Sequence, residues 1–250
     1  MVVLSTDRLG VRFGSRDVLR DITLPPCDGG KVVAIVGPNA AGKSTLFRRI
    51  AALLPGPGSF SIRNVRDPAR AIAYMPQDQS GSAVLTVFEA VLLARKQVSG
   101  WRLRNGDLMA VDQTLQTLGI DHLADEVLSE LSGGQRQLVG LAQCLVRDPQ
   151  VLLLDEPTSA LDMNRQLEAL SCVRGLAREK DMLVLIALHD LNLALKFADE
   201  VAILSNGTLH AFGSAANVLT PDNLATSFRV RARVEPCSRG EPHLIVDEAI

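Results

Sequence analysis

Uninterrupted runs of aliphatic residues divide the chain at three places, residues 32–36, 151–154 and 183–188. A strand with no polar face is expected in the middle of a parallel sheet that is covered on both sides. Between these runs, residues 84–95 and 107–118 and a stretch that opens at 131–135 have the apolar spacing of helices. Strands that alternate with helices predict an α/β fold around a mainly parallel sheet.

Both ends of the chain follow a different pattern. Residues 1–36 alternate short apolar runs with glycine and proline turns, which predicts an antiparallel β region before the first buried strand. In the tail, apolar residues alternate with arginines over 229–234, and residues 243–246 can pair with them around Gly240. This favours a small hairpin that caps the sheet over a regulatory element. The expected organisation is one domain over 1–228, with a helical subdomain at about 79–150, and an extension over 229–250.

Composition excludes several classes of protein. Of the 250 residues, 47% are hydrophobic and 22% charged, which suits a folded chain with a large core. The net charge of -2 gives no overall basic field for nucleic acid, and alternating arginines are ordinary on an exposed strand. The four cysteines lie far apart, which indicates reduced thiols in a cytosolic protein. The first residues lack the features of a signal peptide, and the longest apolar runs have only strand length.

A glycine-rich loop follows the first buried strand and precedes a helical segment. Gly37 and Gly42 bracket it, so that its backbone N–H groups can fold around an anion at the start of the helix. Lys43 would then reach the β- and γ-phosphates of a nucleotide, and the Ser44 hydroxyl would bind Mg²⁺. In this strand–loop–helix context the pattern favours a phosphate-binding loop over an ordinary turn.

Polar residues follow three of the predicted strands. Asp155 and Glu156 end the run 151–154, where Asp155 would hold a metal beside Ser44 and Glu156 would take a proton from water. His189 follows the run 183–188, and Gln77 follows a shorter strand at 71–75. Taken singly, these last two side chains are also compatible with plain loop positions.

Two further features concern nucleotide binding. The segment Leu-Ser-Gly-Gly-Gln at 131–135, hereafter the signature segment, opens a helix with Ser132 as its predicted N-cap. Its glycines leave N–H groups open to an anion, but no lysine lies nearby, which makes sense if a partner brings the phosphate. Phe13, before the turn at 14–15, is either a half-buried strand aromatic or a platform for an adenine ring.

Together these residues resemble the ATP-binding cassette (ABC) ATPases, in family order, over about residues 2–215. The loop 37–45 resembles the Walker A motif, and residues 151–156 resemble Walker B. The signature segment resembles the LSGGQ motif of the family, and residues 159–162 resemble its D-loop. Gln77 matches the Q-loop, and His189 matches the H-loop. Phe13 matches the adenine-stacking aromatic of the family. The resemblance implies a P-loop cassette with an N-terminal antiparallel β region and a helical subdomain that carries the signature segment. It also implies hydrolysis of ATP with Mg²⁺.

The resemblance assigns roles to individual residues. It implies nucleotide binding by Phe13, Gly37, Pro38, Asn39, Ala40, Ala41, Gly42, Lys43, Ser44 and Thr45. It places Mg²⁺ on Ser44, Gln77 and Asp155, and catalysis on Glu156, His189 and Gln77. In this family two cassettes pair head to tail, so Ser132, Gly133, Gly134 and Gln135 would close over the ATP of a second copy. Two departures stand out: Ala40 replaces a usual glycine, and 143–145 replaces a usual Arg-Ala-Leu pattern.

Residues 86–95, 161–168 and 188–192 are similar to the ATP-binding subunits of importers for ferric siderophores, haem and vitamin B12. This resemblance implies a peripheral subunit at the cytoplasmic face of the inner (plasma) membrane. Its expected partners are a permease that contacts residues 79–104 and, indirectly, a substrate-binding protein. The alternatives are another ABC transporter, which stays open, and a soluble ABC ATPase, which the single cassette without a coiled-coil insertion disfavours. A scaffold without hydrolysis is opposed by Glu156 and His189.

Overall fold

The structure is a computed structural model of residues 1–250, and it describes all of them except 66, 69, 78–83 and 101. In the described part, the central sheet has the strand order β11-β10-β5-β9-β8-β7. Every neighbouring pair is parallel except β10 and β11. The strands are β5 (Val32–Val36), β7 (Ile72–Met75), β8 (Val151–Asp155), β9 (Leu183–Ala187), β10 (Glu200–Ser205) and β11 (Thr208–Ser214). The predicted mainly parallel sheet is therefore confirmed.

The alternation of side chains along each strand divides the core between the two faces of the sheet. Val33 and Ile35 of β5 pack with Phe47 of helix α1 (Lys43–Ile50) in one cluster. Ala34 and Val36 belong to a second cluster on the opposite face, with residues of the helices at 133–145, 163–179 and 191–197. Because both faces are covered, β5, β8 and β9 are buried along their whole length, as their unbroken aliphatic runs predicted.

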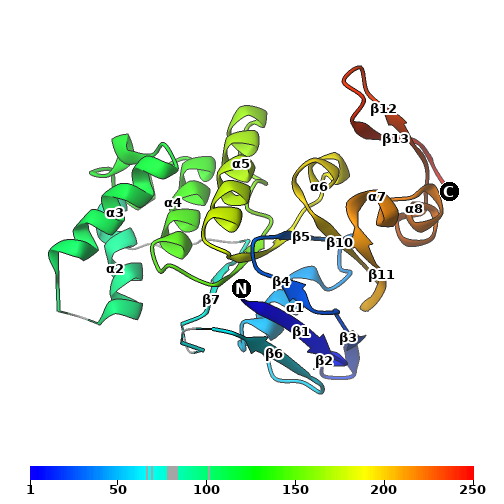
Figure 1. Ribbon diagram of the computed structural model, residues 1–250, viewed down its shortest axis with the longest axis horizontal. Coiled ribbons are helices and arrows are strands. Elements are labelled where there is room, and N and C mark those ends of the chain that lie inside the picture. Colours follow the sequence, from blue (N-terminus) through cyan, green and yellow to red (C-terminus); the bar gives the residue numbers. More distant parts are fainter. Residues whose placement is uncertain (66, 69, 78–83, 101) are drawn as a thin grey trace.

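The antiparallel region expected at the N-terminus is present and lies below the sheet in Figure 1. In it, β1 pairs with β4 and β6, and β2 pairs with β3 around Gly14, whose φ of 59° suits a glycine turn. Its strands are β1 (Val3–Asp7), β2 (Leu9–Phe13), β3 (Arg16–Ile22), β4 (Cys27–Asp28) and β6 (Ser59–Arg63). Both β2 and β3 contact α1, and β3 also contacts β11, so the hairpin lies beside α1.

A group of helices extends to one side of the sheet (Figure 1): α2 (Val87–Ser99), α3 (Asn105–Thr117), η1 (Asp121–Leu123), η2 (Leu128–Glu130) and α4 (Gly133–Leu145). The helix expected from Val84 starts three residues later. Thr86 accepts from the backbone of Glu89, and the Glu89 carboxylate accepts from Thr86, so this capping box fixes the start and leaves Val84 86% exposed. Residues 79–83, the first part of the expected permease contact, lie outside the described residues, as does Trp101.

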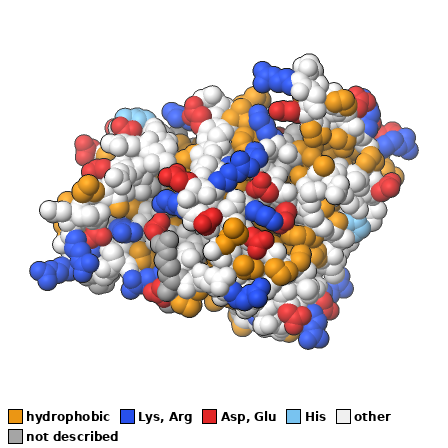
Figure 2. Space-filling model, viewed as in Figure 1, with side chains coloured by type: hydrophobic (Ala, Val, Ile, Leu, Met, Phe, Trp, Pro, Cys, Tyr) orange, Lys and Arg blue, Asp and Glu red, His pale blue; other side chains and the backbone are white. Residues whose placement is uncertain are grey.

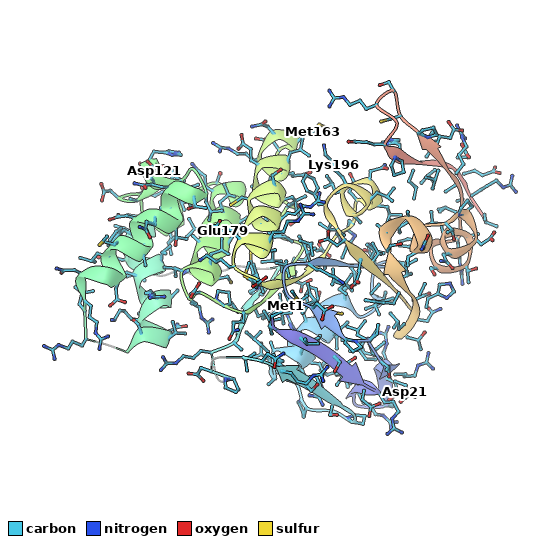
Figure 3. All side chains as sticks on the ribbon, in the orientation of Figure 1. Met1, Asp21, Asp121, Met163, Glu179 and Lys196 are labelled. Atoms are coloured by element: carbon cyan, nitrogen blue, oxygen red, sulfur yellow. The ribbon has the colours of Figure 1, made fainter. Side chains whose placement is uncertain are left out.

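Helix α5 (Met163–Glu179) lies between α4 and α6 (Leu191–Phe197), and Figure 3 labels its two ends at Met163 and Glu179. The remaining helices are α7 (Ala215–Val218) and α8 (Pro221–Phe228). In the described chain, no helix combines the length and the apolar character needed to cross a membrane. Figure 2 shows basic and acidic side chains interspersed on the visible face, in keeping with the small net charge.

The tail forms the expected hairpin from β12 (Val230–Pro236) and β13 (Pro242–Ala249), with Gly240 in the turn. Its largest contacts with the rest of the chain are with α8 and α6. Asn192 of α6 exchanges hydrogen bonds with the backbone N–H and C=O of Leu244, at 2.8 and 3.1 Å, and so holds β13 against the helix. Arg231 and Arg233 pair with acidic residues of the facing strand.

Candidate functional site

One pocket of about 610 Å³ lies where the loop 37–45 meets the carboxyl ends of the parallel strands. Ligand sites of open α/β sheets lie at this edge, because the loops that follow the strands gather there. The pocket is lined by Arg16, Val18, Asn39, Ala40, Ala41, Gly42, Lys43, Ser44, Thr45, Gln77, Glu156 and His189. Residues expected from separate motifs at 39–45, 77, 156 and 189 are therefore brought together.

The loop itself requires its two bracketing glycines. A Cβ on Gly42, which has a φ of 104°, would lie 2.6 Å from Cδ2 of Leu19. A Cβ on Gly37 would lie 2.2 Å from the carbonyl oxygen of Leu204. Both positions therefore need a residue without a side chain, so that β5 can turn sharply into α1 beside β3 and β10. Gly42 ends the loop directly before α1, where the free N–H groups of a helix start attract anions.

Lys43 is the buried cation of the pocket. Its Nζ donates to the carbonyl oxygens of Gly37 at 2.9 Å and Pro38 at 3.3 Å, so the side chain lies back along the loop. Burial lowers the pKa of Lys43, whereas the nearby charges of Glu156 and Asp155 act in the opposite direction. A negatively charged ligand in the loop would give this ammonium group a stronger partner than two neutral carbonyls.

Ser44 and Asp155 face each other at the floor of the site. The Ser44 hydroxyl donates to Oδ1 of Asp155 at 3.0 Å, and the Tyr74 hydroxyl donates to Oδ2 at 3.3 Å. Asp155 is only 1% exposed, and burial raises its pKa because the charged form loses its hydration. Hydroxyl and carboxylate oxygens are the ligands that Mg²⁺ prefers, so this pair has the chemistry of a magnesium site.

Glu156 is held from two sides. His189 Nε2 lies 2.5 Å from Oε1 of Glu156, and Gln77 Nε2 donates to Oε2 at 2.8 Å. The backbone of Glu156 is left-handed, with a φ of 55°, an uncommon conformation for a residue with a Cβ. This turn after β8 directs the carboxylate into the pocket, at the ends of β7 and β9. Gln77, Glu156 and His189, which the sequence predicts from three strand ends, thus form one cluster.

The signature segment and Phe13 are not among the residues that line this pocket. Ser132 caps α4 as predicted: its Oγ accepts from the Gln135 backbone, and its own N–H donates to the Gln135 side chain. Gly133 lies exposed in the first turn of α4, and a Cβ on Gly134 would lie 2.9 Å from the carbonyl of Ala160. Phe13, at the tip of β2, is 51% exposed.

Sequence reasoning missed three residues of the site, Arg16, Val18 and Tyr74. Arg16 is the register partner of Phe13 across the turn, and Val18 lies two residues further along β3, on the same face. A hairpin that turns around Gly14 places residue 16 opposite residue 13, so the sequence contained a signal that Arg16 lies beside Phe13. Tyr74 has no such signal, because its contact with Asp155 depends on the alignment of β7 beside β8.

Comparison with known proteins gives a consistent family. Residues 21–159 match the family model described as ABC transporter. An uncharacterized ABC transporter ATP-binding protein of Methanocaldococcus jannaschii is 36% identical over 98% of both chains. The iron(3+)-hydroxamate import ATP-binding protein FhuC of Bacillus subtilis is 34% identical over 92% of this chain and 89% of its own.

Two further similarities extend the comparison. The cobalamin import ATP-binding protein BtuD of Halobacterium salinarum is 36% identical over 93% of this chain, which spans 60% of that longer protein. A solved chain of an ABC transporter, provisionally assigned to the metal-chelate type and in an inward-facing conformation, aligns with a TM-score of 0.87. It is 27% identical and covers 99% of this chain and 98% of its own. The chain therefore belongs to the ABC transporter family, as an ATP-binding subunit that hydrolyses ATP.

Proposed function

We propose that this chain powers the import of a metal chelate, as one of two identical ATPase subunits beneath a membrane permease. The observation that carries the proposal is the convergence of the loop 39–45, Gln77, Glu156 and His189 in one pocket. This is the set of groups that phosphoryl transfer from ATP to water needs, namely a phosphate cradle, a cation, a base and a ligand for the γ-phosphate.

Nucleotide binding starts from the loop. The N–H groups of 39–45 and the start of α1 bind the β- and γ-phosphates, and Lys43 turns from the carbonyls of Gly37 and Pro38 toward them. The exposed ring of Phe13 stacks on the adenine, and Arg16, its neighbour across the hairpin, stands at the rim of the same pocket. These contacts bring the γ-phosphate toward the ends of β8 and β9.

The residues at the floor of the pocket fit Mg²⁺. Ser44 and Asp155 already lie 3.0 Å apart and offer a hydroxyl and a carboxylate oxygen. Gln77 donates its amide N–H to Glu156, which leaves its carbonyl oxygen as a further ligand. When bound, the metal would neutralise charge on the β- and γ-phosphate oxygens.

Glu156 acts as the general base and His189 as the γ-phosphate ligand. Held between Gln77 and His189, the Glu156 carboxylate is oriented before a nucleotide arrives. It accepts the proton of the attacking water, while Lys43 balances the charge of the phosphate oxygens. When ATP binds, the His189 side chain leaves Glu156 and binds the γ-phosphate.

A second copy of the chain completes the site. The exposed N-terminus of α4, with Ser132, Gly133 and Gly134, offers N–H groups and a hydroxyl outside the pocket of its own chain. In a head-to-tail pair these groups, with Gln135 as their local brace, close over the γ-phosphate held by the other copy. Both hydrolysis sites then form only when two copies meet.

Two named relatives support the substrate class. They are import ATP-binding proteins for cobalamin and for iron(3+)-hydroxamate, both of which are metal chelates. In the proposed complex the permease docks on the helical subdomain, beside Gln77, and the chelate passes through the permease without touching this chain. A substrate-binding protein would deliver the chelate on the opposite side of the membrane.

The test is reconstitution of the full chain with its permease in vesicles, with ATP supplied to the face that carries this chain. Ferric hydroxamate, cobalamin and haem are offered separately with the matching binding protein. We expect ATP-dependent movement of one chelate toward the ATP side, and none with the Lys43→Ala chain. ATP-driven movement away from the ATP side would instead identify an exporter. ATPase activity in cytosolic extract that needs no permease would favour the soluble class.

A further inference from the structure

Gln137 is a buried side chain that joins three parts of the structure. It lies on α4 and is 6% exposed. Its Nε2 donates to the carbonyl oxygen of Glu156 at 2.8 Å and to Oγ of Ser159 at 3.0 Å. Its Oε1 accepts from the backbone N–H of Ala160 at 3.0 Å. One amide thus holds the helix of the signature segment, the residue after β8 and the loop 159–162 together.

The position of Gln137 on α4 gives these contacts their importance. It lies one turn after Gly133, on the same face of the helix. On that face, Gly134 packs so closely on the Ala160 carbonyl that only a glycine fits. Any displacement of the first turn of α4 is therefore transmitted to 159–162 through packing and through Gln137 together.

The other end of the link is the left-handed Glu156. Its φ of 55° is an uncommon conformation, which persists only where the surroundings fix it. Its carbonyl oxygen accepts from Gln137 and from the hydroxyl and N–H of Ser159. The backbone conformation of Glu156 decides the direction of its carboxylate. The Gln137 amide, which binds the Glu156 carbonyl, therefore helps to orient that carboxylate.

We infer that Gln137 is a positioning residue that couples the signature end of α4 to the orientation of Glu156 in the same chain. This inference rests on the proposed function, in which the signature end of α4 meets the nucleotide of the second copy. Closure over that nucleotide then adjusts the base at the chain's own nucleotide. The two hydrolysis sites of the pair communicate through this side chain, which itself touches neither nucleotide.

The first test measures kcat, KM and nucleotide affinity of the full chain with Gln137→Met, which keeps the length and loses all three hydrogen bonds. Gln137→Glu keeps an acceptor for Ala160 but loses the donor to Glu156. We expect kcat to fall at least about tenfold in both variants, as a misplaced catalytic group does. The KM for ATP and the affinity for a fluorescent ADP analogue should stay within about twofold, because the pocket loses no contact.

Gln143→Met is the matched control. Gln143 is the same residue type on the same helix, but its Nε2 donates to the Ala90 carbonyl on α2, away from the pocket. It should keep wild-type kcat even if it lowers Tm as much as Gln137→Met does. A kcat of Gln137→Met within twofold of wild type, or an equal loss in Gln143→Met, would overturn the inference.

The coupling is tested in mixed pairs of Lys43→Ala and Ser132→Arg chains, which leave one intact site. Its nucleotide is bound by the Ser132→Arg chain, and its signature segment comes from the Lys43→Ala chain. Gln137→Met in the Ser132→Arg chain should lower turnover of that site, because its Glu156 loses support. In the Lys43→Ala chain it should also lower that turnover, because the signature end that closes there loses its link to 159–162. An effect from the Ser132→Arg chain alone would mean that Gln137 supports Glu156 without coupling. The ATP turnover of the wild-type pair, and the loss of that turnover in Glu156→Gln, test the proposed function separately, because neither measurement depends on Gln137.

Discussion

Two residues with side chains adopt left-handed backbone conformations beside the nucleotide pocket, Glu156 and Ala40, with φ of 55° and 62°. Such conformations cost free energy unless the surroundings compensate. At Glu156 the compensation is visible, because its carbonyl and both carboxylate oxygens are hydrogen bonded. At Ala40 no comparable set of bonds lies among the described contacts. The two positions therefore call for different tests.

Replacement of Glu156 by glutamine should remove the base and keep the site. Glutamine has the same shape, so the phosphate and metal contacts remain, but its amide is not basic. Turnover should fall by about a hundredfold or more, the scale of a lost general base. Mg-ATP should still bind, and the ATP-closed pair of chains should accumulate in size-exclusion chromatography.

The comparison variant for Glu156→Gln is Asp155→Asn. The adjacent Asp155 bonds to Ser44 and Tyr74 and does not share the contacts of Glu156 with Gln77 and His189. Its asparagine variant should weaken Mg²⁺ binding as well as turnover, measured by titration of the metal. Near-normal hydrolysis by Glu156→Gln would place the base elsewhere.

Glycine at position 40 should relieve the left-handed strain in the loop. The left-handed conformation costs alanine about 1–2 kcal/mol relative to the right-handed one. Glycine avoids this cost, but the greater entropy that it gives the unfolded chain lowers the free energy of unfolding by about 0.4–1 kcal/mol. Ala40→Gly should therefore raise the free energy of unfolding slightly, by about 0–1.6 kcal/mol. The measurement is urea denaturation without nucleotide. The buried neighbour, Ala41→Gly, should lower that free energy, and loss of stability in both variants would refute the strain argument.

Removal of the Phe13 ring should weaken nucleotide binding without unfolding the chain. Phe13 is half exposed at the tip of β2, so Phe13→Ala removes little core packing. If the ring stacks on adenine, ATP affinity should fall by about 1–3 kcal/mol, the value of a lost aromatic platform. Calorimetric titration with ATP measures the change. Leu53→Ala, at another exposed apolar position, should have no effect, and an equal affinity in both variants would return Phe13 to a plain strand residue.

At the scale of elements, a buried ion pair joins the end of α2 to the start of α3. Lys96 Nζ donates to Oδ2 of Asp107 at 2.7 Å, and both side chains are almost fully buried. The Arg104 backbone N–H donates to the same oxygen, which fixes the first turn of α3. The hydrogen bond from Lys96 lowers the pKa of Asp107 from its usual 3.8 to about 2. Asp107 thereby joins the last turns of α2, through Lys96, to the residue before α3, Arg104.

Asp107→Asn should therefore destabilise the helical region in a pH-dependent way. A carboxylate whose pKa is depressed on folding stabilises the native state above its unfolded pKa. The difference in Tm between wild type and variant should be full above pH 4 and should shrink as the pH falls toward 2. Glu168→Gln, which breaks the exposed pair with Arg165, should cause a smaller loss at neutral pH. A Tm difference that does not change between pH 5 and pH 2.5 would contradict this account.

At the scale of the whole molecule, the nucleotide pocket and the signature segment belong to different parts of one chain. The pocket lies at the sheet edge beside the antiparallel region, whereas α4 belongs to the helices on one side (Figure 1). None of the residues that line the pocket comes from α4. Two copies in opposite orientation would bring each pocket to the other copy's α4.

Complementation between two inactive chains tests this pairing. A Lys43→Ala chain mixed with a Ser132→Arg chain places both lesions at one site and leaves the other site intact. We expect each variant alone to be inactive and the mixture to recover ATPase activity. If both groups acted within one chain, every site in the mixture would carry a lesion. A mixture as inactive as its parents would then exclude the pairing.

The sequence alone predicted the central sheet and the loop 37–45, and with the family resemblance it grouped Gln77, Glu156 and His189 into one site. These features are local: an aliphatic run predicts a buried strand, and parallel strands share an edge, so the residues that follow them must meet. The N-cap at Ser132 is equally local, since it depends on residues within one turn. The capping box of Thr86 and Glu89 is also local, so the sequence contained the signal for the start of α2 at Val87. The apolar spacing from Val84 led instead to a start three residues too early.

The tertiary structure decided what depends on register and on contacts between distant segments. The strand order places Tyr74 on Asp155, and the hairpin register places Arg16 opposite Phe13. The packing of α4 against 159–162 creates the Gln137 link. Gln137 lies two residues after the signature segment, but the sequence does not show that its side chain reaches Glu156 and Ala160. The hairpin of 230–249 was predicted from its alternation, but its attachment to α6 rests on Asn192, whose bonds to Leu244 span 52 residues. Local patterns specify an element and its exposed face, whereas its neighbours follow only from the fold of the entire chain.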